Sequence, residues 1–297
     1  MASRVVIGYD GSEASEDALA FGLTWSRSTG DVPIVATVYP EERPFSLGIR
    51  RVDADFVTYV REQAETVQDK ARAAVGDGAL YRNIASTSAS RGLAELAEDA
   101  EAVMVIVGTK QESGLTRALL GSTTERLLYG ATAPVTVVPP VWRQSAPDRI
   151  SSIGAAYLDT REGREALRMA VRAAQRIPAR LTLYSALDQW SEDYSYLVGR
   201  TDEQAFLDKA RDYFGKALEF AAADVPPELK PRTVVLEGAV VDSLAALGPD
   251  DVDMLVCGSR GYGPARRVLL GGVSSRLIRR ARLPIAVVPR ATTGASE

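Results

Sequence analysis

Short apolar runs alternate with amphipathic stretches along the whole chain. Each run spans four to eight residues, is rich in valine and isoleucine, and stops near glycine, proline or aspartate. That pattern is typical of buried β-strands. In the first half of the chain it predicts strands at 4–9, 34–39, 80–85, 103–107 and 134–139.

Between these runs, apolar residues recur every three or four positions, which predicts helices that bury one face. Ser12 stands where an N-cap is expected, because Ala18, Leu19 and Leu23 follow it at helical spacing. The further helices predicted in the first half lie at 56–75, near 93–100 and at 123–129.

The second half repeats this order. Gly108, Gly121 and Pro134 each recur 150 residues later, and Asp10 has a match 149 residues later at Asp159. A unit of that length indicates a duplicated domain, since solenoid repeats are far shorter. The strands predicted here lie near 150–157, 181–187, 233–236, 253–257 and 285–288, and the helices near 162–176, 202–222, 241–247 and 273–280.

Strands that alternate with helices and are apolar on both faces form parallel sheets covered on both sides. We therefore predict two tandem doubly wound α/β domains, at 1–140 and 149–290, each with a five-stranded sheet. A Pro-bounded linker at 141–148 and a tail at 291–297 complete the chain. Ligands of such sheets bind where strands end and the winding direction reverses.

A glycine-bracketed loop follows the fourth predicted strand of each half. The second half has Gly258, Gly261, nine residues, and then Gly271 before a helix; the first has Gly108, a similar loop and Gly121. Glycine lets the backbone approach a phosphate without a Cβ in the way. The first N–H groups of a helix are unpaired and attract anions. This spacing therefore predicts phosphate sites.

Composition narrows the chemistry. The 297 residues include no histidine, which removes the usual general base and the commonest metal ligand. The net charge of −4 offers no footprint for nucleic acid or for an anionic membrane. Cys257, the single cysteine, precludes an intrachain disulfide and fits a reducing compartment. The apolar runs are too short to span a membrane, so we expect a cytoplasmic protein.

The motif resembles that of the universal stress protein family, in tandem form. That family carries Gly, two residues, Gly, nine residues, Gly and then Ser or Thr, with an Asp after the first strand. The resemblance covers nearly the whole chain twice and implies strand order 3-2-1-4-5 and ATP as ligand, with magnesium as a possible companion. It also implies a homodimer through the short Pro-bounded fifth strands at 134–139 and 284–289.

The resemblance also implies a ligand set in each half. Asp10 and Val38 would face adenine, and Gly108, Gly121, Ser122 and Thr123 would hold ribose and phosphates. The corresponding set in the second half is Asp159, Ala186, Gly258, Gly261, Gly271, Gly272, Val273 and Ser274. Asp10 and Asp159 also have a purely structural interpretation, as caps of the following helix or anchors of its loop.

Neither half matches the motif fully. Gln111 replaces the second glycine of the first half, where its side chain would crowd a ligand, and Gly272 replaces the Ser or Thr of the second. Loss of that hydroxyl would cost about 0.5–1.5 kcal/mol. The residues expected to hold phosphates thus match the motif better in the second half, and the residues expected to face adenine match it better in the first. We expect phosphate binding in the second half and do not exclude the first.

The sequence therefore predicts an ATP-binding stress-response or regulatory protein with no catalytic residues and no metal site. Nucleotide would order the glycine loop for an unidentified regulatory partner protein. Two alternatives stay open. One is a slow ATP hydrolase that uses Asp10 with magnesium, and the other is a nucleotide-free scaffold that acts through dimerisation.

Overall fold

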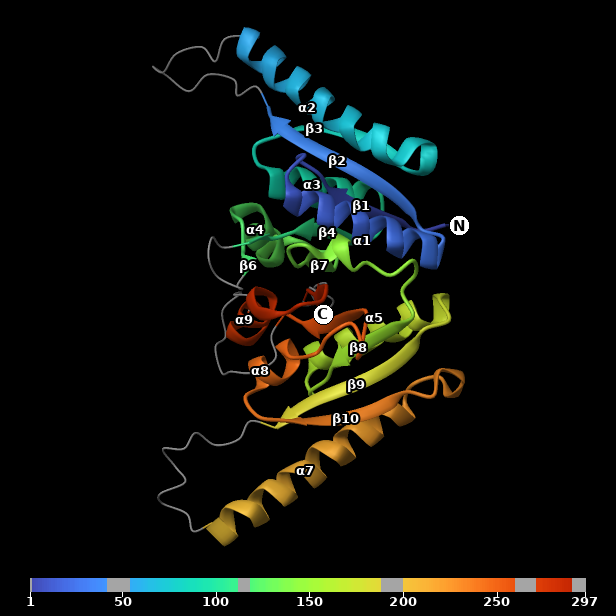
Figure 1. Cartoon of the computed structure of the whole chain (residues 1–297), viewed down its shortest axis with the longest axis vertical. Coiled ribbons are helices and arrows are strands. Elements are labelled where there is room, and N and C mark those ends of the chain that lie inside the picture. The colour runs from blue at the N-terminus through green and yellow to red at the C-terminus, as the bar shows by residue number, and fades with distance from the viewer. Residues whose placement is uncertain (1, 42–53, 112–117, 188–199, 260–270, 290–297) are drawn as a thin grey trace, which may run out of the picture. The chain divides into compact units, whose positions relative to one another are not determined.

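The computed structural model describes residues 2–41, 54–111, 118–187, 200–259 and 271–289. The chain forms two compact units, unit 1 at Met1–Arg149 and unit 2 at Ile150–Glu297 (Figure 1). Both are α/β, as the alternation of apolar runs and amphipathic stretches predicts.

Unit 1 has a parallel sheet whose strands lie in the order β3-β2-β1-β4-β7. Every pairing between neighbours is parallel, for example Gly8 beside Ala36 and Ile7 beside Ile106. Valine and isoleucine dominate four of these strands and are mostly buried there, as a covered parallel sheet requires, whereas the edge strand β3 is largely exposed. The strands are β1 (Arg4–Gly8), β2 (Val32–Pro40), β3 (Leu80–Ser86), β4 (Ala102–Gly108) and β7 (Val135–Val138).

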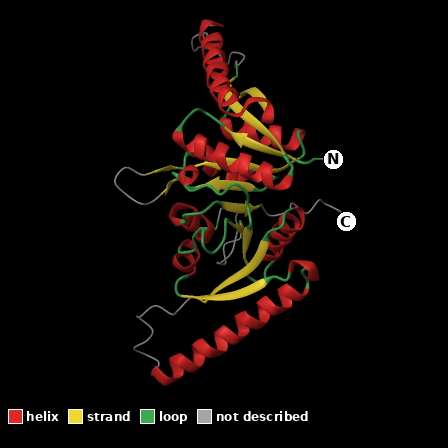
Figure 2. Ribbon diagram, turned by 45° about the vertical axis from the view of Figure 1, so that its right-hand side comes forward, coloured by secondary structure: helices red, strands yellow, loops and turns green. Residues whose placement is uncertain are grey.

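Helices cover both faces of this sheet (Figure 2). The chain winds from β1 through β2 to β3 and then returns to place β4 on the other side of β1. Right-handed crossovers therefore put the first two helices on one face and the last two on the other. These helices are α1 (Glu13–Thr29), α2 (Ala54–Val75), α3 (Ala89–Asp99) and α4 (Ser122–Gly130). The winding reverses between the carboxyl ends of β1 and β4.

Local chemistry sets the ends of α1. Ser12 is its N-cap, as predicted, and its side chain accepts a hydrogen bond from the Ser15 N–H. Gly30 ends the helix in the left-handed conformation, with φ of 76°, which glycine adopts without strain.

The sequence pattern missed a small hairpin next to β4. Strands β5 (Lys110–Gln111) and β6 (Ala118–Leu119) pair antiparallel, with Lys110 beside Leu119. They bracket residues 112–117, which lie outside the described part of the chain. Two-residue strands carry no periodicity, so the alternation that marked the long strands could not reveal them.

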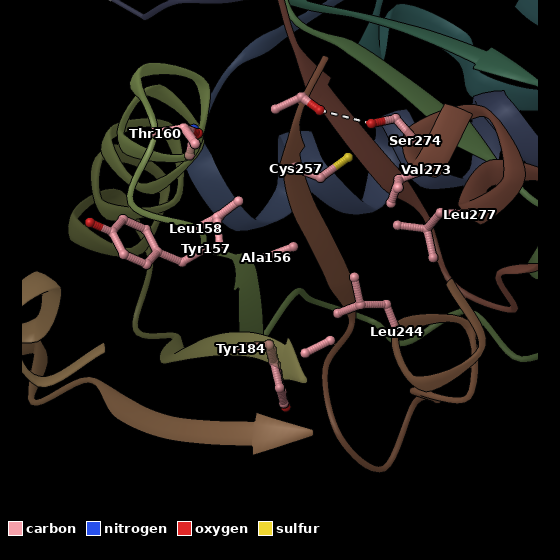
Figure 3. Close-up of a pocket in the computed structure, with 13 residues that line it drawn as sticks. Ala156, Tyr157, Leu158, Thr160, Tyr184, Leu244, Cys257, Val273, Ser274 and Leu277 are labelled. Carbon is pink, nitrogen blue, oxygen red and sulfur yellow. Dashed lines mark hydrogen bonds between the residues drawn. The ribbon is translucent and has the colours of Figure 1, made fainter. Parts of the chain in front are cut away.

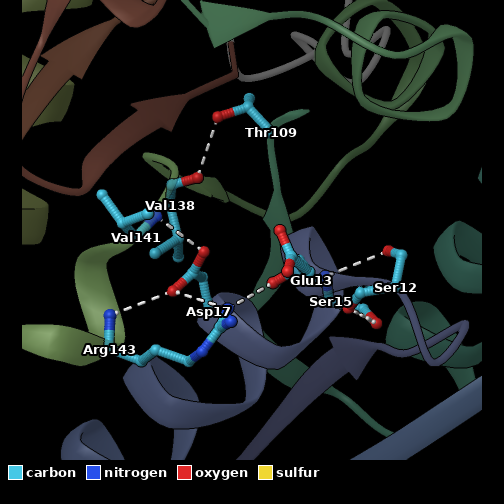
Figure 4. Close-up of polar contacts among 8 residues, drawn as sticks. All are labelled: Ser12, Glu13, Ser15, Asp17, Thr109, Val138, Val141 and Arg143. Carbon is cyan, nitrogen blue, oxygen red and sulfur yellow. Dashed lines mark hydrogen bonds and ion pairs between the residues drawn. The ribbon is translucent and has the colours of Figure 1, made fainter. Parts of the chain in front are cut away.

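The segment predicted as a linker packs on α1 of unit 1. Trp142, in the short helix η2 (Trp142–Gln144), is buried edge-on against Phe21 at 5.3 Å between ring centroids. The buried carboxylate of Asp17 accepts hydrogen bonds from the Val141 N–H at 2.9 Å and the Arg143 N–H at 3.0 Å (Figure 4). Arg143 also donates to the Glu13 carbonyl at 2.9 Å. This cluster fixes the segment to the first turns of α1.

Unit 2 repeats the sheet in the order β10-β9-β8-β11-β12, again all parallel. Its core includes the fully buried Ile153, Leu181, Leu183, Met254 and Leu255. Its strands are β8 (Ser152–Ala156), β9 (Arg180–Leu187), β10 (Arg232–Glu237), β11 (Met254–Gly258) and β12 (Ile285–Val288). Its helices are α5 (Arg161–Arg176), α7 (Arg200–Ala223), α8 (Val240–Ala245) and α9 (Gly272–Arg280), and a short helix η3 spans Pro227–Leu229. The matching short helix η1 of unit 1 spans Gly76–Gly78.

Backbone hydrogen bonds establish which residues of the two units correspond. The Tyr9 N–H donates to the Ala36 carbonyl in unit 1, and the Tyr157 N–H donates to the Tyr184 carbonyl in unit 2. The N-caps Ser12 and Thr160 occupy matching places as well. All three matches are 148 residues apart. The residue of unit 2 that corresponds to Asp10 is therefore Leu158, and the sequence match of Asp10 with Asp159 is displaced by one residue.

Candidate functional site

A cavity of about 240 Å³ opens at the carboxyl ends of β1 and β4 in unit 1. It lies where the winding of the sheet reverses, which is where open α/β sheets bind ligands. Apolar side chains such as Ala36 and Leu93 line one part, and hydroxyl, charged and glycine residues line the rest. All six residues predicted for this half contribute to the lining: Asp10, Val38, Gly108, Gly121, Ser122 and Thr123.

Asp10 is held at the cavity by the turn that starts α1. Its Oδ1 accepts a hydrogen bond from the Ser12 N–H at 3.0 Å and another from the Ser12 hydroxyl. Burial raises the pKa of Asp10, but the Ser12 and Ser15 donors and the positive charge of Lys110 outweigh burial and hold the pKa below its usual value. A carboxylate therefore faces the cavity at neutral pH. Asp10 is both a loop anchor and a charged lining residue.

The two described glycines of the first-half motif differ in what surrounds them. A Cβ on Gly108 would lie 1.8 Å from the Ala14 carbonyl oxygen, so α1 can pack on the end of β4 only if residue 108 is glycine. A Cβ on Gly121 would meet no atom within 4 Å, and Gly121 has an ordinary φ of −66°. The protein itself therefore requires glycine at 108 but not at 121.

The N-terminus of α4 faces the cavity. Gly121 caps this nine-residue helix without a side-chain hydrogen bond, and Ser122 and Thr123 follow it into the lining. The first N–H groups of a helix lack partners within the helix and attract negative charge. Thr124 instead uses its hydroxyl to donate to the Gly108 carbonyl at 3.3 Å, which ties α4 to the end of β4.

Sequence reasoning missed Lys110 and Ser15, which also line the cavity. Lys110 stands two residues after Gly108, inside the motif, so its closeness to Gly108 was the available signal. Ser15 lies on the first turn of α1, and the signal for it was its place three residues after the predicted N-cap.

The corresponding cavity of unit 2 is much smaller, about 30 Å³ (Figure 3). Four of the residues predicted for this half line it, namely Ala186, Gly258, Val273 and Ser274. Asp159, Gly271 and Gly272 are not among the lining residues, and Gly261 lies outside the described residues. The expectation that the second half keeps the better phosphate end does not match this difference in volume.

The side chains around the two cavities differ at three matching places. Leu158 stands in the place of Asp10, Tyr184 in that of Ala36, and Val273 in that of Thr123. Tyr184 is 5% exposed and packs over Gly154, where a Cβ would lie 3.1 Å from the ring. Cys257 also lines the cavity, and burial raises the pKa of its thiol to about 12. That thiol is uncharged at neutral pH, as expected for an inert buried cysteine.

The remaining predicted residues of unit 2 have partners elsewhere. Asp159 is exposed and forms an ion pair with Arg164 at 2.6 Å, which holds the pKa of Asp159 below its usual value. The Ser274 hydroxyl donates to the Gly258 carbonyl at 2.9 Å, as Thr124 does to Gly108 in unit 1. The Gly271 N–H donates to the Ser259 carbonyl at 2.8 Å. These contacts build the end of β11 and the start of α9.

The lining of the unit 1 cavity combines charged, hydroxyl and apolar groups. Within the described ranges, no group of three or more His, Cys, Asp or Glu side chains is placed to hold a metal ion. The cavity offers one carboxylate, one ammonium, hydroxyl groups and a helix N-terminus next to an apolar wall. Such a site suits a ligand with an apolar ring at one end and anionic oxygens at the other.

Comparisons with known proteins agree with this architecture. The family model described as the universal stress protein family matches residues 1–139 and again 150–289. Universal stress protein Rv2319c of Mycobacterium tuberculosis is 26% identical over 301 residues, which cover 96% of this chain and 99% of the relative. Universal stress protein Rv2623 of the same organism is 24% identical, with 97% of each chain covered.

Among solved structures, a universal stress protein from Archaeoglobus fulgidus superposes with a TM-score of 0.63 at 18% identity, covering 97% of this chain and 98% of that one. A putative universal stress protein from Pseudomonas aeruginosa gives 0.61 at 14% identity, with 98% and 94% covered. At such identities the likeness concerns the fold. Because the family model matches both units in succession, the chain belongs to the universal stress protein family as a tandem member.

Proposed function

We propose that unit 1 binds ATP in the cavity between β1 and β4, and that the protein acts as a nucleotide-dependent regulatory protein. The observation that carries this proposal is the convergence of Asp10, Val38 and the Gly121–Thr123 helix start on one cavity of about 240 Å³. An ionised carboxylate, an apolar wall and a helix N-terminus are the three features that a nucleotide needs from such a site.

The chemistry of the lining orients the ligand. Adenine lies against Val38, Ala36 and Leu93, where its exocyclic amine or a ribose hydroxyl donates to the Asp10 carboxylate. Phosphates lie at the start of α4, away from Asp10, because a carboxylate and a phosphate repel each other. The open space at Gly121 allows the ligand to approach the backbone there.

Unit 2 is proposed to bind no nucleotide. Leu158 offers no acceptor in the place of Asp10, and the cavity of unit 2 has a volume of only about 30 Å³. This proposal reverses the expectation from the glycine motif alone. It predicts one nucleotide per chain rather than two.

We propose a binding role rather than catalysis, because the carboxylate, the ammonium, the hydroxyl groups and the helix N-terminus around the cavity suit the holding of a nucleotide. A slow ATP hydrolase that depends on Asp10 and magnesium is the rival from another class. Phosphate release that disappears in Asp10→Ala would favour that rival. A nucleotide-free scaffold is the remaining alternative.

Cytoplasmic location and a homodimer formed through β7 and β12 remain proposals. None of the helices in the described part of the chain is long and apolar enough to cross a membrane. Light scattering on purified protein, with and without ATP, would test the dimer and any dependence of assembly on nucleotide.

The proposed function is tested by calorimetric titration of nucleotide-stripped protein with ATP, with and without magnesium. One site per chain is expected. Two sites would show that the side chains filling unit 2 are no obstacle to binding. Absence of heat, together with no displacement of a fluorescent ATP analogue, would leave the scaffold.

A further inference from the structure

Lys110 is placed by the hairpin that the sequence pattern did not reveal. It is the first residue of β5 and pairs with Leu119 of β6. Gly121, the cap of α4, follows only two residues after Leu119. The hairpin therefore holds the Lys110 backbone close to the start of α4, and the lysine side chain joins Ser122 and Thr123 in lining the cavity.

Lys110 and Asp10 are the only charged side chains among the described residues that line this cavity. No described carboxylate forms an ion pair with Lys110, whose side chain is exposed. Its charge nevertheless acts on Asp10, whose pKa it helps to lower. Among the described lining residues, the cavity thus has one negative and one positive group that interact without an ion pair.

We propose that Lys110 makes the unit 1 site selective for adenosine polyphosphates, so that affinity rises with each phosphate from adenosine to ATP. This inference rests on the proposed nucleotide site and adds to it the residue that sets its preference among adenine nucleotides. Each added phosphate brings negative charge to the end of the cavity where Lys110 and the α4 N-terminus lie, and carries it away from Asp10. Adenosine has no group that Lys110 would attract.

The test is a set of calorimetric titrations with ATP, ADP, AMP and adenosine in EDTA, so that magnesium does not shield the phosphates. The variants are Lys110→Met, which removes the charge at similar length, and Lys110→Arg, which keeps it. Lys70→Met is the matched control, because Lys70 is exposed on α2 and does not line the cavity.

For the unaltered protein we expect affinity in the order ATP, ADP, AMP, adenosine. Lys110→Met should weaken ATP binding by about tenfold to a hundredfold, which is the range for loss of one charged hydrogen bond. It should leave the affinity for adenosine within about twofold of the unaltered protein. Lys110→Arg should retain most of the preference, and Lys70→Met should change nothing.

Two results would overturn the inference while leaving the nucleotide site intact. One is equal affinity of the unaltered protein for adenosine and ATP, and the other is an equal loss for all four ligands in Lys110→Met. If the unaltered protein binds none of the four ligands, the proposed function itself fails and this inference falls with it.

Discussion

The two units of this chain share a strand order and a glycine motif, yet their cavities differ about eightfold in volume, 240 Å³ against 30 Å³. The glycines do not cause this difference, since Gly108 and Gly258 both end a strand beside the first helix. The lining differs instead at three matching places, those of Asp10, Ala36 and Thr123 in unit 1. A motif can thus persist for packing after the site around it has changed.

The largest expected effect concerns the packing role of the motif. Gly108→Ala should destabilise unit 1 by about 3 kcal/mol, the upper range for overpacking, because the new Cβ would lie 1.8 Å from the Ala14 carbonyl oxygen. Gly121→Ala is the matched variant and should cost only about 0.5–1 kcal/mol, because alanine is a poorer helix N-cap than glycine.

Urea unfolding monitored by circular dichroism would measure both variants. The same Gly121→Ala protein should still weaken ATP binding, since its Cβ enters space that the ligand is proposed to use. Equal destabilisation by the two substitutions would contradict the distinction between a glycine needed for packing and one needed for a ligand.

The second prediction compares the acids at matching positions on the first helix of each unit. Asp17 is buried and accepts from the Val141 and Arg143 backbone N–H groups, whereas Glu165 pairs with Arg168 at the surface. Asp17→Asn should cost about 2 kcal/mol, because hydrogen bonds to a buried charge contribute about 1.5–3 kcal/mol each and asparagine keeps one acceptor. Glu165→Gln should cost at most about 0.5 kcal/mol.

Thermal unfolding and limited proteolysis near residue 143 would measure the effect of Asp17→Asn. Because Trp142 packs on Phe21 beside this carboxylate, we expect faster cleavage after Arg143 in the variant. Unchanged cleavage would mean that the ring contact alone holds this segment on α1.

Much of the fold could be predicted because its strands and helices obey simple periods. Short apolar runs identified most of the long strands, although β3 and β10 are not apolar on both faces, and Ser12 identified the start of α1. The hairpin at Lys110 could not be predicted, since two residues carry no period. The same limit hid the role of Asp17, because nothing local in the sequence indicates that its carboxylate meets a segment more than 120 residues away.

The candidate site was only partly predictable. All six residues expected in the first half line one cavity, because glycine spacing and strand ends are local features. The lining of the second cavity includes Tyr184 from the neighbouring strand β9, and the register of the strands puts Leu158 rather than Asp159 in the place of Asp10. Such relations arise only when strands are brought together, so the glycine motif alone could not disclose them.

The third prediction tests whether Leu158, rather than Asp159, is the counterpart of Asp10. Asp10→Leu gives unit 1 the residue that unit 2 has at the matching place. It should weaken ATP binding by about tenfold or more, because one hydrogen bond to a charged acceptor is lost. Asp159→Leu makes the same chemical change one residue from the matching place and should leave ATP binding unaltered. An equal loss in Asp159→Leu would instead place the nucleotide in unit 2.

The smallest expected effect concerns acidity. Ser12→Ala removes a donor to the Asp10 carboxylate and should raise the pKa of Asp10 toward its unfolded value of about 3.9. In the unaltered protein the lowered pKa contributes stability above about pH 4, which is lost as the pH falls through the folded value, so the variant should lose less stability on acidification. NMR titration of the carboxyl carbons of Asp10 and Asp159 would measure the pKa of each side chain.

The matched change in unit 2 is Thr160→Ala, which removes the other N-cap. It should leave the pKa of Asp159 unchanged, because Arg164 rather than the cap residue holds that carboxylate in its charged form. Arg164→Ala should raise it. If Ser12→Ala leaves the pKa of Asp10 unchanged, then the backbone N–H at position 12 and the Ser15 hydroxyl are enough to keep the carboxylate ionised, and Ser15→Ala in the same protein should raise that pKa.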